Sequence, residues 1–158
     1  MKIAVFGIGG VGGFVEGALA KSHAETYFFA RGENLDAIRA KGLKVQSSVL
    51  GDFVAWPKLA SDRAEEFGIM DAVFVCCKGY SLKAACEAIF PAVGPETAVI
   101  PLLNGVIVSD IMEPLLLPCI LADGTIRVFS RLEKPGHIIQ TMEMCSIAFG
   151  MKDGSRPA

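Results

Sequence analysis

The stretch "AVFGIGGVGGFVEGALAK", Ala4–Lys21, joins a short apolar run to a cluster of glycines and then to a helical stretch. Gly7, Gly9 and Gly12 fit the pattern G-x-G-x-x-G, which is weak evidence by itself. Its position is more informative, because a phosphate-binding turn must follow a strand directly and open a helix. In such a turn Gly7 allows the tight bend, Gly9 lets the backbone approach a pyrophosphate, and Gly12 permits close packing of helix and strand.

The backbone amides of this turn lie at the positive end of the predicted helix dipole, where anions bind favourably. The alternative is a glycine-rich turn in an unrelated α/β domain. We therefore predict that the amides at Gly9–Gly12 face the phosphates of a dinucleotide. The predicted cofactor-binding residues of this turn are Gly7, Ile8, Gly9, Gly10, Val11 and Gly12.

The end of the second predicted strand indicates which dinucleotide binds. Enzymes that use NAD usually place Asp or Glu there, where the carboxylate binds the ribose hydroxyls. In "YFFARGEN" this position holds Arg31, whose guanidinium matches a 2′-phosphate with paired, charge-assisted hydrogen bonds. Glu33 is a rival that could face a ribose, although acidic residues are common in the first turn of a helix for dipole reasons alone. The pattern favours NADP.

Two further strand ends carry polar residues, where ligands bind in parallel sheets. Lys78 follows "FVCC" and could add a second cation for the 2′-phosphate. Asn104 follows "VIPLL" and could present its amide to the nicotinamide side of the cofactor or to the substrate. The simpler alternatives are a lysine at the start of a helix and an N-cap asparagine.

Apolar runs and helical stretches alternate along the chain, which is typical of a doubly wound parallel sheet, the Rossmann fold. From Thr125 to Gly150 the pattern changes to two or three antiparallel strands, turned at Lys134–Pro135–Gly136. We also expect two short strands around an interruption at Gly51–Asp52. The other predicted strands are Lys2–Phe6, Thr26–Ala30, Asp71–Cys77, Ala98–Leu102 and Pro118–Ala122, and the predicted helices are Gly10–Ser22, Leu35–Lys41, Ser81–Phe90 and Val106–Leu116.

Composition limits the possible partners and location. A net charge of −2 favours neither nucleic acid nor an anionic membrane as partner, and the apolar fraction of 52% supports a substantial core. The longest apolar region, residues 98–122, is broken by three prolines, so it offers no membrane helix of about 20 residues. The five cysteines lack the spacing of a zinc site or a disulfide framework. We expect a cytoplasmic protein that holds no metal.

Several motifs together resemble the ketopantoate reductase (2-dehydropantoate 2-reductase) family, in its N-terminal NADP-binding domain. The resemblance covers almost the whole chain and is more specific than the glycine pattern alone. It rests on "KIAVFGIGGVGG" (2–13), "FFARGENLDAIRAKGLKVQS" (28–47), "GDF" (51–53), "DAVFVCCKGYS" (71–81), "LLNGV" (102–106), "EKPGHI" (133–138) and "IAFGMKDGS" (147–155).

The resemblance implies NADPH-dependent reduction of a 2-oxo acid, ketopantoate to pantoate, in the route to pantothenate and coenzyme A. It places Arg31 and Lys78 at the 2′-phosphate end of the cofactor and Asn104 at the nicotinamide and substrate side. The family's acid lysine and its substrate-binding residues lie in a following helical domain, so no catalytic residue is assigned within this chain. Residues 1–150 are then the NADP-binding domain and 151–158 the start of a linker to that domain.

Four points remain open. The chain could be a non-catalytic dinucleotide-binding or redox-sensing module that needs a partner. Another alternative is a different Rossmann enzyme, such as a methyltransferase that uses S-adenosylmethionine. An acidic residue at the end of the second predicted strand would indicate such an enzyme, and Arg31 argues against it. Glu16 stands where the family usually has a small residue, and a carboxylate turned toward the sheet or the diphosphate would cost binding. A Rossmann domain without its helical domain would also expose an apolar face, fit for that domain or for a second copy.

Overall fold

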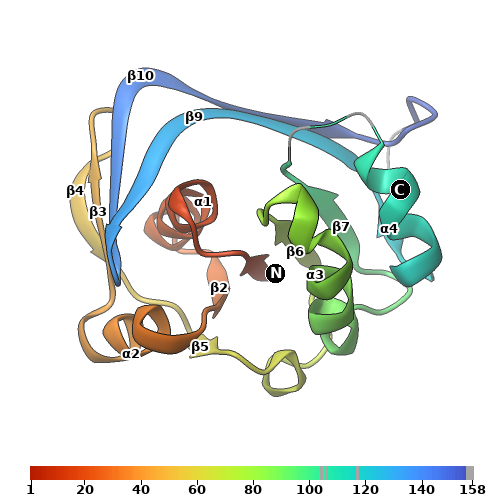
Figure 1. Ribbon diagram of the computed structural model, residues 1–158, viewed down its shortest axis with the longest axis horizontal. Helices are drawn as coiled ribbons and strands as arrows, with labels where there is room; N and C mark the ends of the chain where they lie inside the picture. The colour runs from red at the N-terminus through yellow and green to blue at the C-terminus, as the bar shows by residue number, and fades with distance from the viewer. Residues whose placement is uncertain (104, 106, 117, 156–158) are drawn as a thin grey trace.

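The computed structural model describes residues 1–103, 105, 107–116 and 118–155, and its centre is a parallel sheet of six strands (Figure 1). Every neighbouring pair in this sheet is parallel. The strand order reverses beside β1, since β2 pairs with one of its edges and β6 with the other. Ligands bind at such a reversal, outside the carboxyl ends of the strands. In spatial order the strands are β5 (Leu59–Ser61), β2 (Glu25–Phe29), β1 (Lys2–Phe6), β6 (Ala72–Val75), β7 (Ala98–Pro101) and β8 (Ile120–Leu121).

Helices cover both faces of this sheet, because successive side chains of a strand point to opposite faces. Phe6 of β1 belongs to an apolar cluster with Cys86 of one helix and Met112 of another. Val5, the preceding residue, belongs to the cluster on the other face, which includes Val15. The helices are α1 (Gly10–Lys21) and α2 (Gly32–Lys41) on one face, and α3 (Leu82–Ile89) and α4 (Val108–Leu116) on the other.

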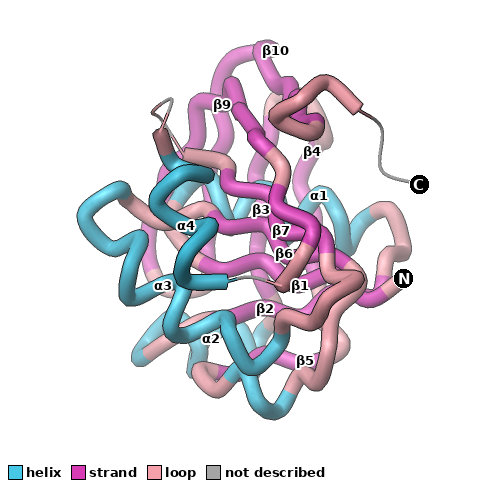
Figure 2. The backbone as a smooth tube through the Cα atoms, turned by 90° about the vertical axis from the view of Figure 1, so that its right-hand side faces the viewer, coloured by secondary structure: helices cyan, strands magenta, loops and turns pink. Residues whose placement is uncertain are grey.

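A second, mixed sheet covers the outer side of α1. Its strands lie in the order β4 (Gly51–Ala55), β3 (Leu43–Ser47), β10 (His137–Gly150) and β9 (Asp123–Lys134). Figure 1 shows α1 enclosed between this sheet and β1 and β2, and in Figure 2 β9, β10 and β4 lie above β1, β2 and β5. A Cβ added to Gly17 would lie 2.6 Å from Cγ2 of Val45 in β3, so the small residues of α1 permit this double contact.

The predicted fold class, a doubly wound sheet with a C-terminal antiparallel extension, is confirmed. The extension is one long hairpin, β9–β10, that turns at Pro135–Gly136. Its parallel pairing with β3, and the short strand β5, were not predicted. The break expected at Gly51–Asp52 lies earlier, at Ser48–Leu50, because the Ser47 hydroxyl accepts the N–H groups of Val49 and Leu50 and starts the turn there.

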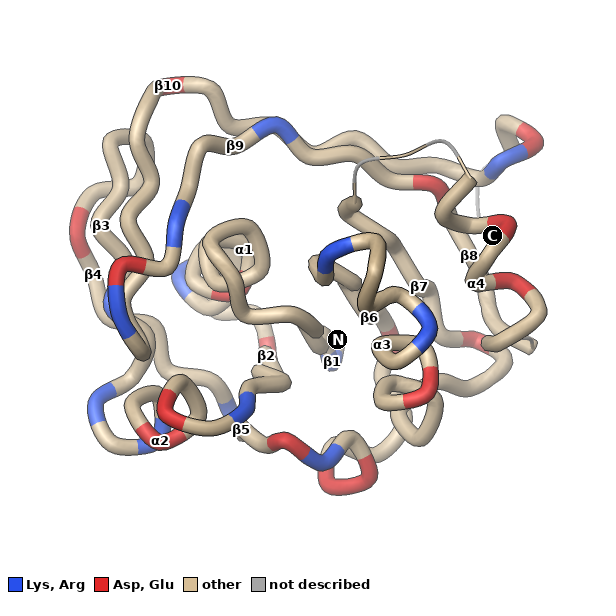
Figure 3. Tube along the Cα trace, in the orientation of Figure 1, with Lys and Arg blue, Asp and Glu red and all other residues tan. Residues whose placement is uncertain are grey.

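Charge and helix length agree with the composition. Figure 3 shows basic and acidic residues interspersed over the described chain, without a large region of one sign. No helix within the described ranges is long and apolar enough to cross a bilayer. The same residues contain no group of three or more His, Cys, Asp or Glu side chains that could hold a metal ion.

Candidate functional site

The glycine turn, Gly7–Gly9, connects the carboxyl end of β1 to α1. Gly7 has a φ of +102°, which side chains with a Cβ rarely adopt. The Gly9 N–H donates to the Gly7 carbonyl at 2.9 Å, and the Gly13 N–H donates to the Gly9 carbonyl at 3.0 Å. No described side chain caps this end of α1. The first amides of the helix are therefore available to an anion.

Space around the turn separates two kinds of glycine. A Cβ on Gly12 would lie 2.1 Å from the Gly7 carbonyl oxygen, and one on Gly10 would lie 2.3 Å from the Ser130 carbonyl oxygen of β9. These two positions hold the helix against the turn and against the second sheet. A Cβ on Gly9 would meet nothing within 4 Å. Gly9 thus leaves room for a group that approaches the backbone closely, as a pyrophosphate does.

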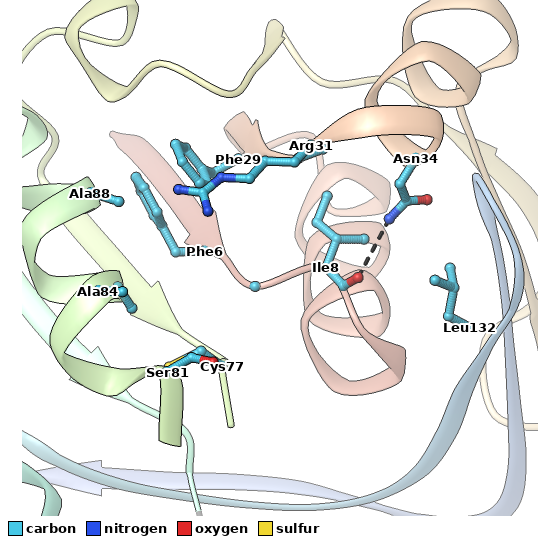
Figure 4. A pocket seen from close by; sticks show the side chains of 13 residues that line it. Phe6, Ile8, Phe29, Arg31, Asn34, Cys77, Ser81, Ala84, Ala88 and Leu132 are labelled. Atoms are coloured by element: carbon cyan, nitrogen blue, oxygen red, sulfur yellow. Dashed lines mark hydrogen bonds between the residues drawn. The ribbon is translucent and has the colours of Figure 1, made fainter. Parts of the chain in front are cut away.

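A cavity of about 400 Å³, which we call the first cleft, opens beside the glycine turn (Figure 4). It lies at the carboxyl ends of β1 and β2, the place where parallel sheets bind ligands. Its lining residues are Phe6, Gly7, Ile8, Phe29, Ala30, Arg31, Asn34, Cys77, Ser81, Ala84, Ala85, Ala88 and Leu132.

Arg31 is the cation of the first cleft. It is the N-cap residue of α2, and its Cζ lies 5.1 Å from the centre of the Phe29 ring, in a cation–π contact. Figure 4 shows its side chain extending from the start of α2 toward Phe6 and Phe29. None of the ion pairs in the described part of the chain includes Arg31. Its guanidinium is therefore free to pair with an anionic ligand.

Glu33, the rival to Arg31, lies in the first turn of α2 and is exposed. It is not among the residues that line the first cleft. Its position matches the common preference for acidic residues near the positive end of a helix dipole.

Lys78 lies elsewhere, in a second cleft of about 410 Å³. This cleft also contains Val11 from the first turn of α1 and Arg127 from β9, and no carboxylate lines it among the described residues. Cys77 lines both clefts. The structure thus places Arg31 with Gly7 and Ile8, and Lys78 with Val11.

The strand order explains this separation of the two cations. Arg31 follows β2 and Lys78 follows β6, which pair with opposite edges of β1. Neighbouring strands are about 4.8 Å apart, so the ends of β2 and β6 are separated by about 10 Å, with the glycine turn between them. Asn104, the predicted nicotinamide and substrate residue, lies outside the described residues. The preceding Leu102 and Leu103 line the second cleft.

Sequence reasoning missed Asn34. Its Nδ2 donates to the Ile8 carbonyl oxygen at 3.4 Å, and its Oδ1 accepts the Gly136 N–H at 2.7 Å. No signal in the sequence marks it, since a polar residue in the first turn of a helix is usual. Leu132 and Ser81 also line the cleft and were not predicted, because only the tertiary fold brings them there.

Burial raises the pKa of three titratable groups beneath the site, Cys76, Cys77 and Glu16. Burial raises the pKa of the Cys76 and Cys77 thiols, so they stay protonated and are poor nucleophiles at neutral pH. Glu16 of α1 is 0% exposed, and neither of its carboxyl oxygens has a hydrogen-bond partner among the described residues. Burial raises the pKa of this carboxyl well above its usual range.

Comparisons with known proteins show which family the chain resembles. A family model described as ketopantoate reductase PanE/ApbA matches residues 3–154. A 2-dehydropantoate 2-reductase of Mesorhizobium japonicum is 37% identical over 107 residues, which are 67% of this chain and 32% of the relative. An uncharacterized oxidoreductase of Bacillus subtilis, YkpB, is 30% identical over 156 residues, which are 99% of this chain and 50% of the relative.

Among solved structures, the 2-dehydropantoate 2-reductase of Porphyromonas gingivalis W83 is similar, with a TM-score of 0.87 and 34% identity. The match covers 94% of this chain and 54% of that one. The chain therefore spans about half or less of the length of these relatives. The match of the family model over nearly all of the sequence shows that the chain belongs to the ketopantoate reductase family.

Proposed function

We propose that this chain is the cofactor-binding part of an NADPH-dependent reductase of 2-oxo acids, with ketopantoate as substrate and pantoate as product. The observation that carries the proposal is the Arg31 guanidinium, which has no carboxylate partner in the described chain and lines the same cleft as the glycine turn. A fork of N–H donors beside an anion-binding helix end suits a dinucleotide with a 2′-phosphate.

The described residues fit such a cofactor. The amides at the start of α1 would bind the diphosphate, and Arg31 would pair with the 2′-phosphate. The bound cofactor supplies the hydride for the keto carbon, while the keto oxygen gains a proton. The resemblance assigns Lys78 to the 2′-phosphate as well, which requires its side chain to reach across the glycine turn. Lys78 lies in the same cleft as Val11 of the first turn of α1, so it could contact the diphosphate without crossing the turn. We therefore favour the diphosphate as the partner of Lys78.

Residues 1–150 would form the NADP-binding domain, and 151–158 would begin the linker to the family's helical domain. That domain would supply the acid lysine and bind the 2-oxo acid, and no described residue is assigned to catalysis. Asn104 remains the proposed contact to nicotinamide and substrate. All five cysteines are free thiols, which supports a reducing, cytoplasmic location.

The outer part of the β9–β10 hairpin is the proposed contact surface for that domain. Its apolar side chains are exposed, and Figure 3 shows few charges along these strands. Exposed apolar patches of this kind mark interaction sites. The helical domain, or a second copy of the chain, would cover them. The exposed residues are Phe129, Met142, Met144, Ile147 and Phe149.

The test is a fluorescence titration with NADPH and with NADH. Wild-type chain should bind NADPH more tightly, and Arg31→Ala should weaken NADPH binding by about ten- to a hundredfold while leaving NADH unchanged, because only NADPH loses a charge-assisted contact. Arg63→Ala is the matched control, since Arg63 is an exposed cation that pairs with Glu66 and lines neither cleft. Equal affinity for both dinucleotides, unchanged by Arg31→Ala, would refute the assignment.

A non-catalytic dinucleotide-binding or redox-sensing module is the second candidate. The same cleft and the same unpaired Arg31 guanidinium would serve it equally. Both candidates predict dinucleotide binding, so turnover must separate them. A helical domain encoded in the same reading frame, together with oxidation of NADPH by ketopantoate when that domain is present, would support the reductase.

A further inference from the structure

Asn34 joins three segments that surround the first cleft. It belongs to α2, its Nδ2 donates to the Ile8 carbonyl oxygen in the glycine turn, and its Oδ1 accepts the Gly136 N–H at the tip of the β9–β10 hairpin. Figure 4 shows the side chain pointing at Ile8 from the start of α2. These segments are far apart in the sequence, so one side chain fixes their relative positions.

The hairpin tip is also held against α2 by close packing. Gly136 has a φ of +71°, and a Cβ built on it would lie 2.9 Å from the Cβ of Ala37, one turn after Asn34. Leu132, near the same tip, lines the first cleft. The anchored tip therefore forms part of the cleft wall, and Asn34 connects that wall to the turn that would bind phosphate.

Building on the proposed function, we propose that Asn34 is a positioning residue that holds the glycine turn in the form that accepts a diphosphate. The Asn34 side-chain amide has both an acceptor for the Gly136 N–H and a donor for the Ile8 carbonyl, whereas an alanine has neither and an ionised aspartate has only the acceptor. The bond to Gly136 orients the amide, and the amide then holds the Ile8 carbonyl away from the helix end. A carbonyl turned toward the phosphates would bring a partial negative charge against them.

Two small ligands separate this role from a general effect on the fold. ADP-ribose carries the diphosphate without a 2′-phosphate, and 2′-AMP carries the 2′-phosphate without a diphosphate. Asn34→Ala should bind ADP-ribose about three- to tenfold more weakly, the effect of one lost hydrogen bond, and should bind 2′-AMP within twofold of wild type. Isothermal titration of the full chain measures both affinities.

Two further variants complete the test. Asn34→Asp keeps an acceptor for the Gly136 N–H but cannot donate to Ile8, so it should lose at least as much ADP-ribose affinity as Asn34→Ala. Arg39→Ala removes a side-chain bond from the same helix, to the Ala60 carbonyl at 3.0 Å, outside both clefts, and should change neither affinity.

The outcomes are distinct. The positioning role would be overturned if Asn34→Ala or Asn34→Asp bound ADP-ribose with wild-type affinity. It would also be overturned if Asn34→Ala lost affinity for ADP-ribose and for 2′-AMP by the same factor. If wild-type chain binds neither ligand, the proposed function itself fails. If it binds ADP-ribose but not 2′-AMP, the preference for NADP fails while the role of Asn34 is still measured.

Discussion

The buried carboxyl of Glu16 is expected to make the protein less stable as the pH rises. Glu16 is 0% exposed in α1, beneath the second sheet, and burial alone raises the pKa of its carboxyl well above its usual range. The nearby Cys76 thiol offers no positive charge to offset this effect. The unfolded chain loses the proton near the ordinary value of 4.5, while the folded chain keeps it at higher pH.

The sign and size follow from the protons bound. Above the ordinary pKa the folded state holds one proton more than the unfolded state, so the free energy of unfolding falls with rising pH. The fall is about 1.4 kcal/mol for each pH unit over which the folded carboxyl stays protonated. Below the ordinary pKa both states are protonated and this contribution vanishes. The Glu16→Gln variant cannot ionise and should lose this slope.

Urea unfolding at pH 5, 6 and 7, followed by circular dichroism, measures the effect. The difference in free energy of unfolding between Glu16→Gln and wild type should grow with pH, by about 1.4 kcal/mol for each pH unit over which the folded carboxyl stays protonated. Glu113→Gln, which removes a carboxyl from an exposed position of α4, should show no comparable growth. A constant difference between Glu16→Gln and wild type from pH 5 to 7 would show that the Glu16 carboxyl titrates as it does in water, and would refute the reasoning.

Four further variants test the site and its surroundings. Gly12→Ala should destabilise the fold by about 1–3 kcal/mol in urea unfolding, because its Cβ would lie 2.1 Å from a backbone oxygen. Gly9→Ala should keep wild-type stability but weaken NADPH binding, because a Cβ there meets no protein atom and would occupy the space left for the phosphates. Wild-type NADPH binding by Gly9→Ala would contradict a close approach of the cofactor at that position. Lys78→Ala should weaken NADPH and NADH binding by similar factors, roughly tenfold, since Lys78 lies across the glycine turn from Arg31; a loss confined to NADPH would place it at the 2′-phosphate instead. Met144→Ser combined with Phe149→Ser should reduce binding of a hydrophobic dye and self-association in sedimentation, and unchanged values would argue against an apolar contact surface there.

The sequence determined the parts of the fold that depend on neighbouring residues. The strand, the glycine turn and the helix of residues 2–21 follow from an apolar run and from the small residues after it, which are local features. Arg31 was found because it directly follows a predictable strand. The order of strands and helices was predicted for the same reason, since hydrophobic periodicity repeats within each element.

Tertiary structure decided which of these residues share a cleft. Arg31 and Lys78 look alike in sequence, each a cation after an apolar strand, yet β2 and β6 pair with opposite edges of β1 and separate them. The parallel pairing of β3 with β10 joins segments about ninety positions apart, which local patterns do not encode. Asn34 has two partners because the tip of the β9–β10 hairpin folds against α2, beside the glycine turn. Glu16 is likewise decided by packing, since it is buried in the folded protein where neither carboxyl oxygen has a hydrogen-bond partner among the described residues.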